Sequence, residues 1–77
     1  MEVSVDSPVQ VVFNSRPLEL VYRGRSIKIT QVGLHHKYYE GRILHHVYSV
    51  ASETAFYRLN FNTENLIWIL EAYELQQ

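Results

Sequence analysis

Basic and aromatic side chains are concentrated in the middle of this 77-residue chain. Residues 16–46 carry six lysines and arginines against two acidic residues, whereas the rest carries one arginine against six acidic residues. Cations attract the phosphate backbone of nucleic acids, and flat rings stack on unpaired bases. This chemistry predicts a nucleic-acid surface made of Arg23, Arg25, Lys28, Lys37, Tyr38, Tyr39 and Arg42.

Two considerations limit that prediction. The same charges could instead solvate strand edges, where lysine and arginine also discourage aggregation. The sequence pI of about 6.4 argues against strong nonspecific binding, for which clearly basic domains are typical. Weak or partner-assisted binding of nucleic acid is compatible with both.

Two histidine pairs, at 35–36 and 45–46, are the candidate metal ligands of the chain. Neighbouring residues of a strand point to opposite faces of a sheet, so each pair offers at most one histidine to a shared site. No cysteine is present, and no carboxylate spacing supports the histidines. We therefore expect no metal and no other cofactor. The candidate ligands of a histidine metal site are His36 and His45, and a thermal shift on addition of zinc would test them.

Sequence motifs for nucleophilic or acid–base catalysis are missing from the chain. The chain has no Gly-x-Ser-x-Gly motif, no cysteine and no phosphate-binding glycine loop. Its acidic residues are scattered rather than paired for acid–base chemistry. We therefore expect a protein that is not an enzyme.

Short runs of alternating apolar residues, separated by turn residues, cover residues 17–70 and must position these side chains. The pattern predicts an all-β fold, a small five-stranded antiparallel meander or SH3-like barrel. The strands are expected over Leu18–Arg23, Ile27–Thr30, Leu44–Val50, Thr54–Phe61 and Leu66–Leu70. The expected core is Leu20, Tyr22, Ile27, Ile29, Tyr48, Val50, Tyr57, Leu59, Trp68 and Leu70.

Other parts of the chain lack this clear alternation. Residues 33–42 are expected to form the longest loop, and residues 1–8 a flexible N-terminal arm. Residues 9–77 then form a single small β-domain, in which residues 9–13 are a candidate extra strand. Residues 64–75 are rich in Leu, Glu and Ala, so an α+β fold with a C-terminal helix there is the alternative.

Residues 17–70 contain, in this order, Pro17, Tyr22-Arg23-Gly24-Arg25, Tyr48-x-Val50, Tyr57-x-Leu59-x-Phe61 and Trp68-x-Leu70. The order resembles a group of small bacterial and archaeal domains of unknown function. In that group an aromatic-x-Gly-Arg turn opens a short β-meander, a Trp-x-Leu strand closes it, and some members are encoded near DNA-repair polymerases. The resemblance implies a β-meander associated with DNA. This chain departs from the group in the middle loop, where it has His35-His36-Lys37-Tyr38-Tyr39 and the group usually carries a tryptophan.

These observations predict a non-enzymatic accessory binding module associated with nucleic acid. The alternative is a protein-interaction or self-assembly module, because a strand over residues 66–70 points Ile67 and Ile69 outward beside Phe56 and creates an apolar homodimer face. No apolar stretch approaches the ~18 residues of a membrane span. No leader sequence is recognised at the start, so we expect a cytoplasmic protein without membrane contact.

Overall fold

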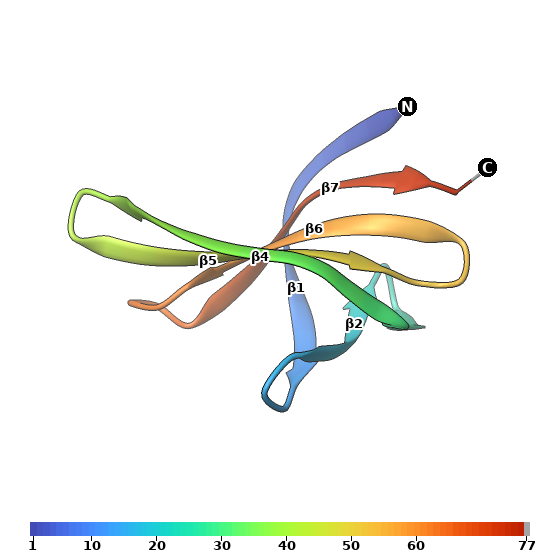
Figure 1. Ribbon diagram of the computed structural model, residues 1–77, viewed down its shortest axis with the longest axis horizontal. Coiled ribbons are helices and arrows are strands. Elements are labelled where there is room, and N and C mark those ends of the chain that lie inside the picture. Colours follow the sequence, from blue (N-terminus) through green and yellow to red (C-terminus); the bar gives the residue numbers. More distant parts are fainter. Residues whose placement is uncertain (77) are drawn as a thin grey trace.

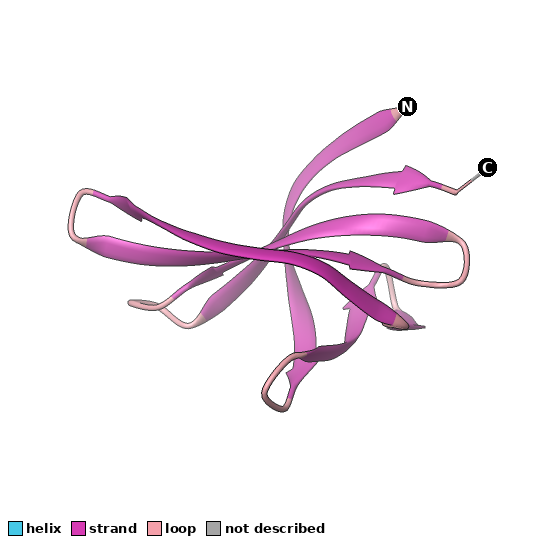
Figure 2. Cartoon of the chain, in the orientation of Figure 1, coloured by secondary structure: helices cyan, strands magenta, loops and turns pink. Residues whose placement is uncertain are grey.

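The computed structural model describes residues 1–76, which form seven β-strands and no helix (Figure 1, Figure 2). All neighbouring strands are antiparallel. The predicted all-β class is therefore confirmed, and the alternative with a helix over residues 64–75 is wrong. The strands are β1 (Glu2–Phe13), β2 (Pro17–Tyr22), β3 (Arg25–Lys28), β4 (Gln31–Glu40), β5 (Ile43–Ala51), β6 (Ala55–Asn62) and β7 (Ile67–Leu75).

One sheet contains these strands in the order β3-β2-β1-β7-β6-β5-β4. Strand β1 belongs to two ladders, because residues 2–9 pair with β7 and residues 10–13 pair with β2. The β2–β3 hairpin is thereby turned away from the middle of the sheet, and β2 lies beside the lower part of β1 in Figure 1. We call the face of the sheet that the β2–β3 hairpin covers the inner face; it carries Tyr48 and Leu59. We call the opposite face the outer face; it carries Asn60.

The hydrophobic core lies between the inner face and the β2–β3 hairpin. Its five most buried members are Leu20, Tyr48, Val50, Leu59 and Leu70. Tyr22, Ile27, Ile29, Tyr57 and Trp68 pack against them, so all ten predicted core residues are confirmed. The valines at positions 5, 9, 11 and 32 complete the cluster, and none of them was in the predicted core.

The sheet does not close into a five-stranded barrel. Strands β3 and β4 are at the two ends of the sheet order but are consecutive in the chain. Thr30 between them donates its backbone N–H to the carbonyl oxygen of Ala51 at 2.8 Å. No ladder joins β3 to β4 within residues 1–76, so the molecule is an open, twisted sheet in which β1 and β4 raise the strand count above the expected five.

Strand β1 includes the residues that were expected to form a flexible arm. Residues 5, 7, 9 and 11 are partly buried, and the residues between them are exposed. Four of the odd-numbered positions are valines, which favour strands. Because residues 2–9 pair with β7 in the middle of the sheet, the expectation of a separate arm over residues 1–8 is wrong.

Strand β4 replaces the predicted loop over residues 33–42. It pairs with β5 from end to end, and the two-residue turn Gly41-Arg42 joins the two strands. Gly41 has a φ of 61°, which fits the first position of a type II′ hairpin turn. The rings of Tyr38 and His45 stack across the pair with centroids 4.9 Å apart. Cross-strand ring pairs therefore stabilise a strand that lacks apolar alternation.

Strand β7 forms from residues with good helix propensity because it lies between β1 and β6 in the sheet. Both of its edges are paired, which requires an extended backbone. Tertiary pairing here overrides the local preference of leucine, glutamate and alanine for helix. Within residues 1–76, no helix is long and apolar enough to cross a membrane.

Candidate binding groove of aromatic and histidine side chains

A groove opens on the inner face where this face extends past the core toward the β4–β5 turn. Its volume is about 320 Å³. Phe13 on its rim is 45% exposed, so the groove is open to solvent. The residues that line it, which we call the aromatic groove, are Phe13, His46, Tyr48, Phe61, Thr63 and Trp68.

Four strands bring these rings together from distant parts of the chain. His46 lies opposite Phe61 in the β5–β6 ladder, and Phe61 lies opposite Trp68 in the β6–β7 ladder. Phe13 ends β1, and its ring centroid is 5.9 Å from Trp68 and 6.0 Å from Tyr48. The centroids of Phe61 and Trp68 are 4.7 Å apart. These separations are those of favourable aromatic pairs, so the rings form one continuous wall.

A histidine pair borders this wall. Nε2 of His35 lies 2.8 Å from Nδ1 of His46, and the His35 ring stacks on Tyr48 with centroids 4.2 Å apart. Burial lowers the pKa of His46, and the positive charges of His35 and Lys37 lower it further. Burial also raises the pKa of the Tyr48 hydroxyl. The wall therefore presents a neutral imidazole and a neutral phenol near pH 7.

The β4–β5 register explains which histidines meet. Lys37 pairs with His46 and His35 with Tyr48, so these four side chains share the inner face. His36 and His45, the candidate metal ligands, occupy the alternate positions of the same strands and therefore face outward. One histidine of each pair does reach a shared contact, but the two that meet are His35 and His46 rather than the candidate ligands His36 and His45. Within residues 1–76, no group of three or more histidine or acidic side chains is arranged to hold a metal ion.

The basic residues that the sequence groups together lie at two ends of the molecule. Arg23, Arg25 and Lys28 belong to the β2–β3 hairpin, where Arg25 and Lys28 share a pocket with the turn that follows β5. Lys37 and Arg42 belong to the β4–β5 hairpin, at the start of β5. At a rise of ~3.3 Å per residue, β5 separates the two groups by roughly 26 Å. The predicted residues therefore do not form one continuous basic surface.

The two predicted tyrosines lie on opposite faces of β4. Tyr38 stacks on His45 on the outer face, whereas Tyr39 shares the inner face with Lys37 near the hairpin turn. Lys37, opposite His46, is the predicted residue that borders the aromatic groove. The structure therefore divides the predicted basic and aromatic set by face as well as by end.

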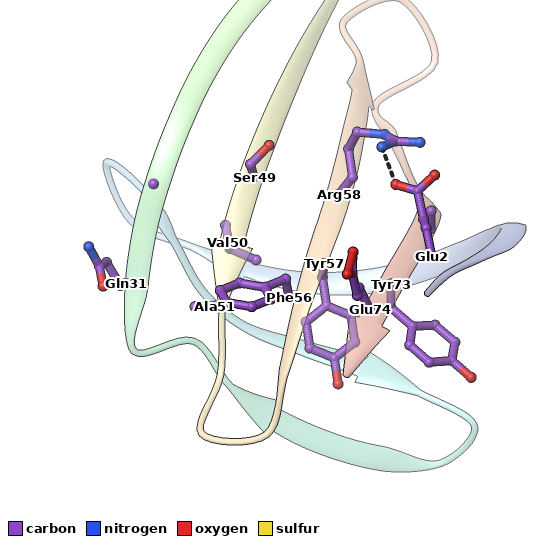
Figure 3. Close-up of a pocket in the computed structure, with 12 residues that line it drawn as sticks. Glu2, Gln31, Ser49, Val50, Ala51, Phe56, Tyr57, Arg58, Tyr73 and Glu74 are labelled. Carbon is purple, nitrogen blue, oxygen red and sulfur yellow. Dashed lines mark hydrogen bonds and ion pairs between the residues drawn. The ribbon is translucent and has the colours of Figure 1, made fainter. Parts of the chain in front are cut away.

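The outer face carries a chain of polar contacts. Arg58 donates hydrogen bonds to Glu2 and to Glu71, both at 2.7 Å, and Figure 3 shows the contact with Glu2. Asn60 donates to Glu71 at 2.7 Å and to the hydroxyl oxygen of Tyr38 at 3.0 Å. The hydrogen bonds from Arg58 to Glu71 and then to Glu2 raise the pKa of Arg58. Charged and amide groups therefore occupy the centre of this face.

This polar network divides the predicted apolar face of Phe56, Ile67 and Ile69. Phe56 lies near one end of the β6–β7 ladder, opposite Glu74, and Ile67 lies at the other end. Phe56 borders a pocket of about 280 Å³ (Figure 3), whereas the two isoleucines line a separate pocket of about 260 Å³. The structure brings Ile67 and Ile69 together but keeps Phe56 apart from them.

The sequence does not single out Phe13 and Phe61 as binding residues, although a signal for them is present. Phe13 lies two residues after Val11, and Phe61 lies two residues after Leu59. Each phenylalanine therefore extends the row of apolar side chains on the inner face of its strand. An aromatic residue at the last position of such an alternation lies where the core meets solvent. Thr63 gives no comparable signal, because it belongs to the turn after β6.

Comparisons of the chain with protein-family models, with curated proteins and with solved structures find no match. The resemblance based on the Tyr22-Arg23-Gly24-Arg25 turn and the Trp68-x-Leu70 strand therefore stays a prediction.

Proposed function

We propose that this protein is a non-enzymatic binding module that holds a short stretch of single-stranded nucleic acid, with unpaired bases in the aromatic groove. The observation that carries the proposal is the groove whose wall is formed by the buried ring of Tyr48 and the partly buried rings of Phe61 and Trp68, with the exposed ring of Phe13 on its rim. Concave apolar and aromatic surfaces of this kind are typical ligand sites. Bases offer flat faces to such rings, and each stacked base contributes ~1–3 kcal/mol.

Positive side chains on either side of the wall support a phosphate-bearing ligand. Lys37 lies on the inner face opposite His46, and Arg42 lies in the adjoining hairpin turn. Arg16 lies in the turn that follows Phe13. Lysine and arginine at these places neutralise backbone phosphates while the bases stack between them. Glu64 in the β6–β7 turn opposes them, which is consistent with weak rather than strong binding.

The arrangement favours a single strand over a duplex. A duplex hides the faces of its bases in the stack, so the rings of the groove have nothing to bind there without unpairing it. Duplex binding without base contacts requires a continuous positive surface, and the basic residues here are split between two ends of the molecule.

Fluorescence anisotropy of labelled single-stranded and double-stranded oligonucleotides of about 12 nucleotides tests the proposal. Phe13→Ser removes a rim ring of the groove, and Phe56→Ser is the matched control, because Phe56 is 51% exposed but on the outer face. We expect Phe13→Ser to weaken single-strand binding about tenfold, and Phe56→Ser to change it less than about twofold. No binding at low salt, or equal weakening by both changes, would overturn the proposal.

A further inference from the structure

The two edges of the sheet are protected to very different extents. Strand β3 forms one edge with four residues and carries Arg25 and Lys28. Short length and positive charge keep natural edge strands from pairing with other chains. Strand β4 forms the other edge with ten residues, of which 33–40 are all exposed. It contains no proline, it carries one lysine, Lys37, and its irregularity lies toward one end, between Val32 and Leu34. The regular run of residues 35–40 is therefore the part of this edge that is open to another strand.

Unpaired backbone groups line the free side of β4. Hydrogen bonds alternate along an antiparallel ladder, so only every second residue bonds to a given neighbour. The two-residue turn makes Glu40 and Ile43 a hydrogen-bonded pair, and Lys37 and Tyr39 therefore direct their N–H and C=O groups away from β5. These unpaired N–H and C=O groups can form ladder hydrogen bonds with a strand of another molecule.

We propose that β4 pairs in antiparallel fashion with β4 of a second copy of this chain, about a two-fold axis at Tyr38. On the outer face this register places His36 opposite Glu40 of the partner subunit, twice by symmetry. On the inner face it places Lys37 opposite Tyr39 of the partner subunit. The first pair is a histidine–carboxylate contact and the second a cation–π contact, so the strand is complementary to itself.

Neighbouring registers lack this complementarity. A two-fold axis perpendicular to the sheet keeps the inner faces of both subunits on one side of the sheet. Residues directly opposite each other in an antiparallel pair point to the same face, so the axis must pass at a residue and not between two residues. An axis at Lys37 sets two lysines against each other, and an axis at His36 sets His35 against Lys37 of the partner subunit. Like charges directly opposite each other destabilise a strand pair. Of these three registers, the one at Tyr38 sets histidine against carboxylate on the outer face and lysine against a ring on the inner face, with Tyr38 opposite its own copy.

This pairing joins the inner faces of two subunits into one surface. The two aromatic grooves then lie on the same side of a continuous sheet, with Lys37 and Tyr39 of each subunit between them. The inference does not depend on what the groove binds, because it rests on the β4 edge and on its side chains.

Sedimentation velocity of the full chain from about 5 to 500 µM tests the dimer. Glu40→Lys should weaken dimerisation about tenfold, because it sets lysine against His36 in both symmetric pairs. It also removes the 3.5 Å contact between Glu40 and His45 of the same chain, and the double variant described below controls for this because it lacks that contact too. Glu64→Lys is the matched control with the same change of charge in the β6–β7 turn, and it should change dimerisation less than about twofold.

Restoration tests the register itself. The double variant His36→Glu with Glu40→Lys re-forms an opposite-charge pair and should return the dimer to within about threefold of the wild type. Circular dichroism establishes that each variant keeps its strands. A monomer at every concentration would overturn the proposal. A dimer that responds equally to Glu40→Lys and Glu64→Lys, or that the double variant fails to restore, would also overturn it.

Discussion

The contact between His35 and His46 makes the rim of the aromatic groove sensitive to protons. The 2.8 Å hydrogen bond requires one ring to donate and the other to accept, so it is lost when both rings are protonated. Burial and the positive charges of His35 and Lys37 keep the pKa of His46 below its usual 6.5. The folded protein therefore prefers a neutral His46.

Stability should fall as the solution is acidified through the histidine range. The unfolded chain binds more protons than the folded chain between the lowered pKa of His46 and 6.5, so the stabilisation is present above 6.5 and is lost as pH falls. His46→Gln should flatten the pH dependence of the unfolding free energy between about pH 7.5 and 5, whereas His36→Gln on the outer face should not. Urea denaturation at each pH measures this, and equal slopes in all three proteins would contradict it.

Among the elements, the β4–β5 hairpin depends on one turn residue, Gly41. Gly41 has a φ of 61°, and a Cβ there would meet nothing within 4 Å, so the obstacle to a larger residue is the backbone conformation alone. Gly41→Ala should reduce the unfolding free energy by about 1 kcal/mol. Gly33→Ala is the matched control, because its Cβ would make an ordinary 3.5 Å contact with the Ser49 carbonyl oxygen. Its effect should stay within about 0.5 kcal/mol, and a larger loss at Gly33 than at Gly41 would refute this account.

The two basic groups should contribute differently to binding because they lie on different hairpins. Lys37→Glu should weaken single-strand binding and reduce the slope of log affinity against log salt by about 0.7, the value for one phosphate contact. Arg25→Glu makes the same change of charge at the far end of β5 and should leave both quantities nearly unchanged. Anisotropy titrations at several salt concentrations measure them. A larger effect of Arg25→Glu would move the binding surface to the β2–β3 hairpin.

Sequence reasoning located the elements whose one face is apolar. Strands β2, β3, β5, β6 and β7 follow alternating residues, and their inner positions form the predicted core. Strand β4 was missed because histidine and tyrosine occupy both of its faces, so no period of two is visible in its hydropathy. What makes it a strand is ring stacking against β5, for example of His35 on Tyr48, which only the register reveals.

In the whole molecule, the candidate site arises from convergence that the sequence does not display. Phe13 and Trp68 meet because β1 passes from the β7 ladder to the β2 ladder, and this places its last residue over the inner face. Residue types alone grouped Lys37 with Arg25, although β5 holds them at opposite ends of the sheet. The sequence identified the two histidine pairs as a candidate metal site, but the β4–β5 register determines that His35 and His46 are the two histidines in contact.

The most direct test of the groove is the fluorescence of Trp68, the single tryptophan of the chain, which lines it. Titration with an unlabelled single-stranded oligonucleotide should quench this emission in a saturable manner, with the same Kd as the anisotropy measurement, because a stacked base contacts the groove. A duplex of equal length should leave the emission nearly unchanged. Single-strand binding detected by anisotropy without any change in Trp68 emission would place the nucleic acid elsewhere on the molecule and contradict the account.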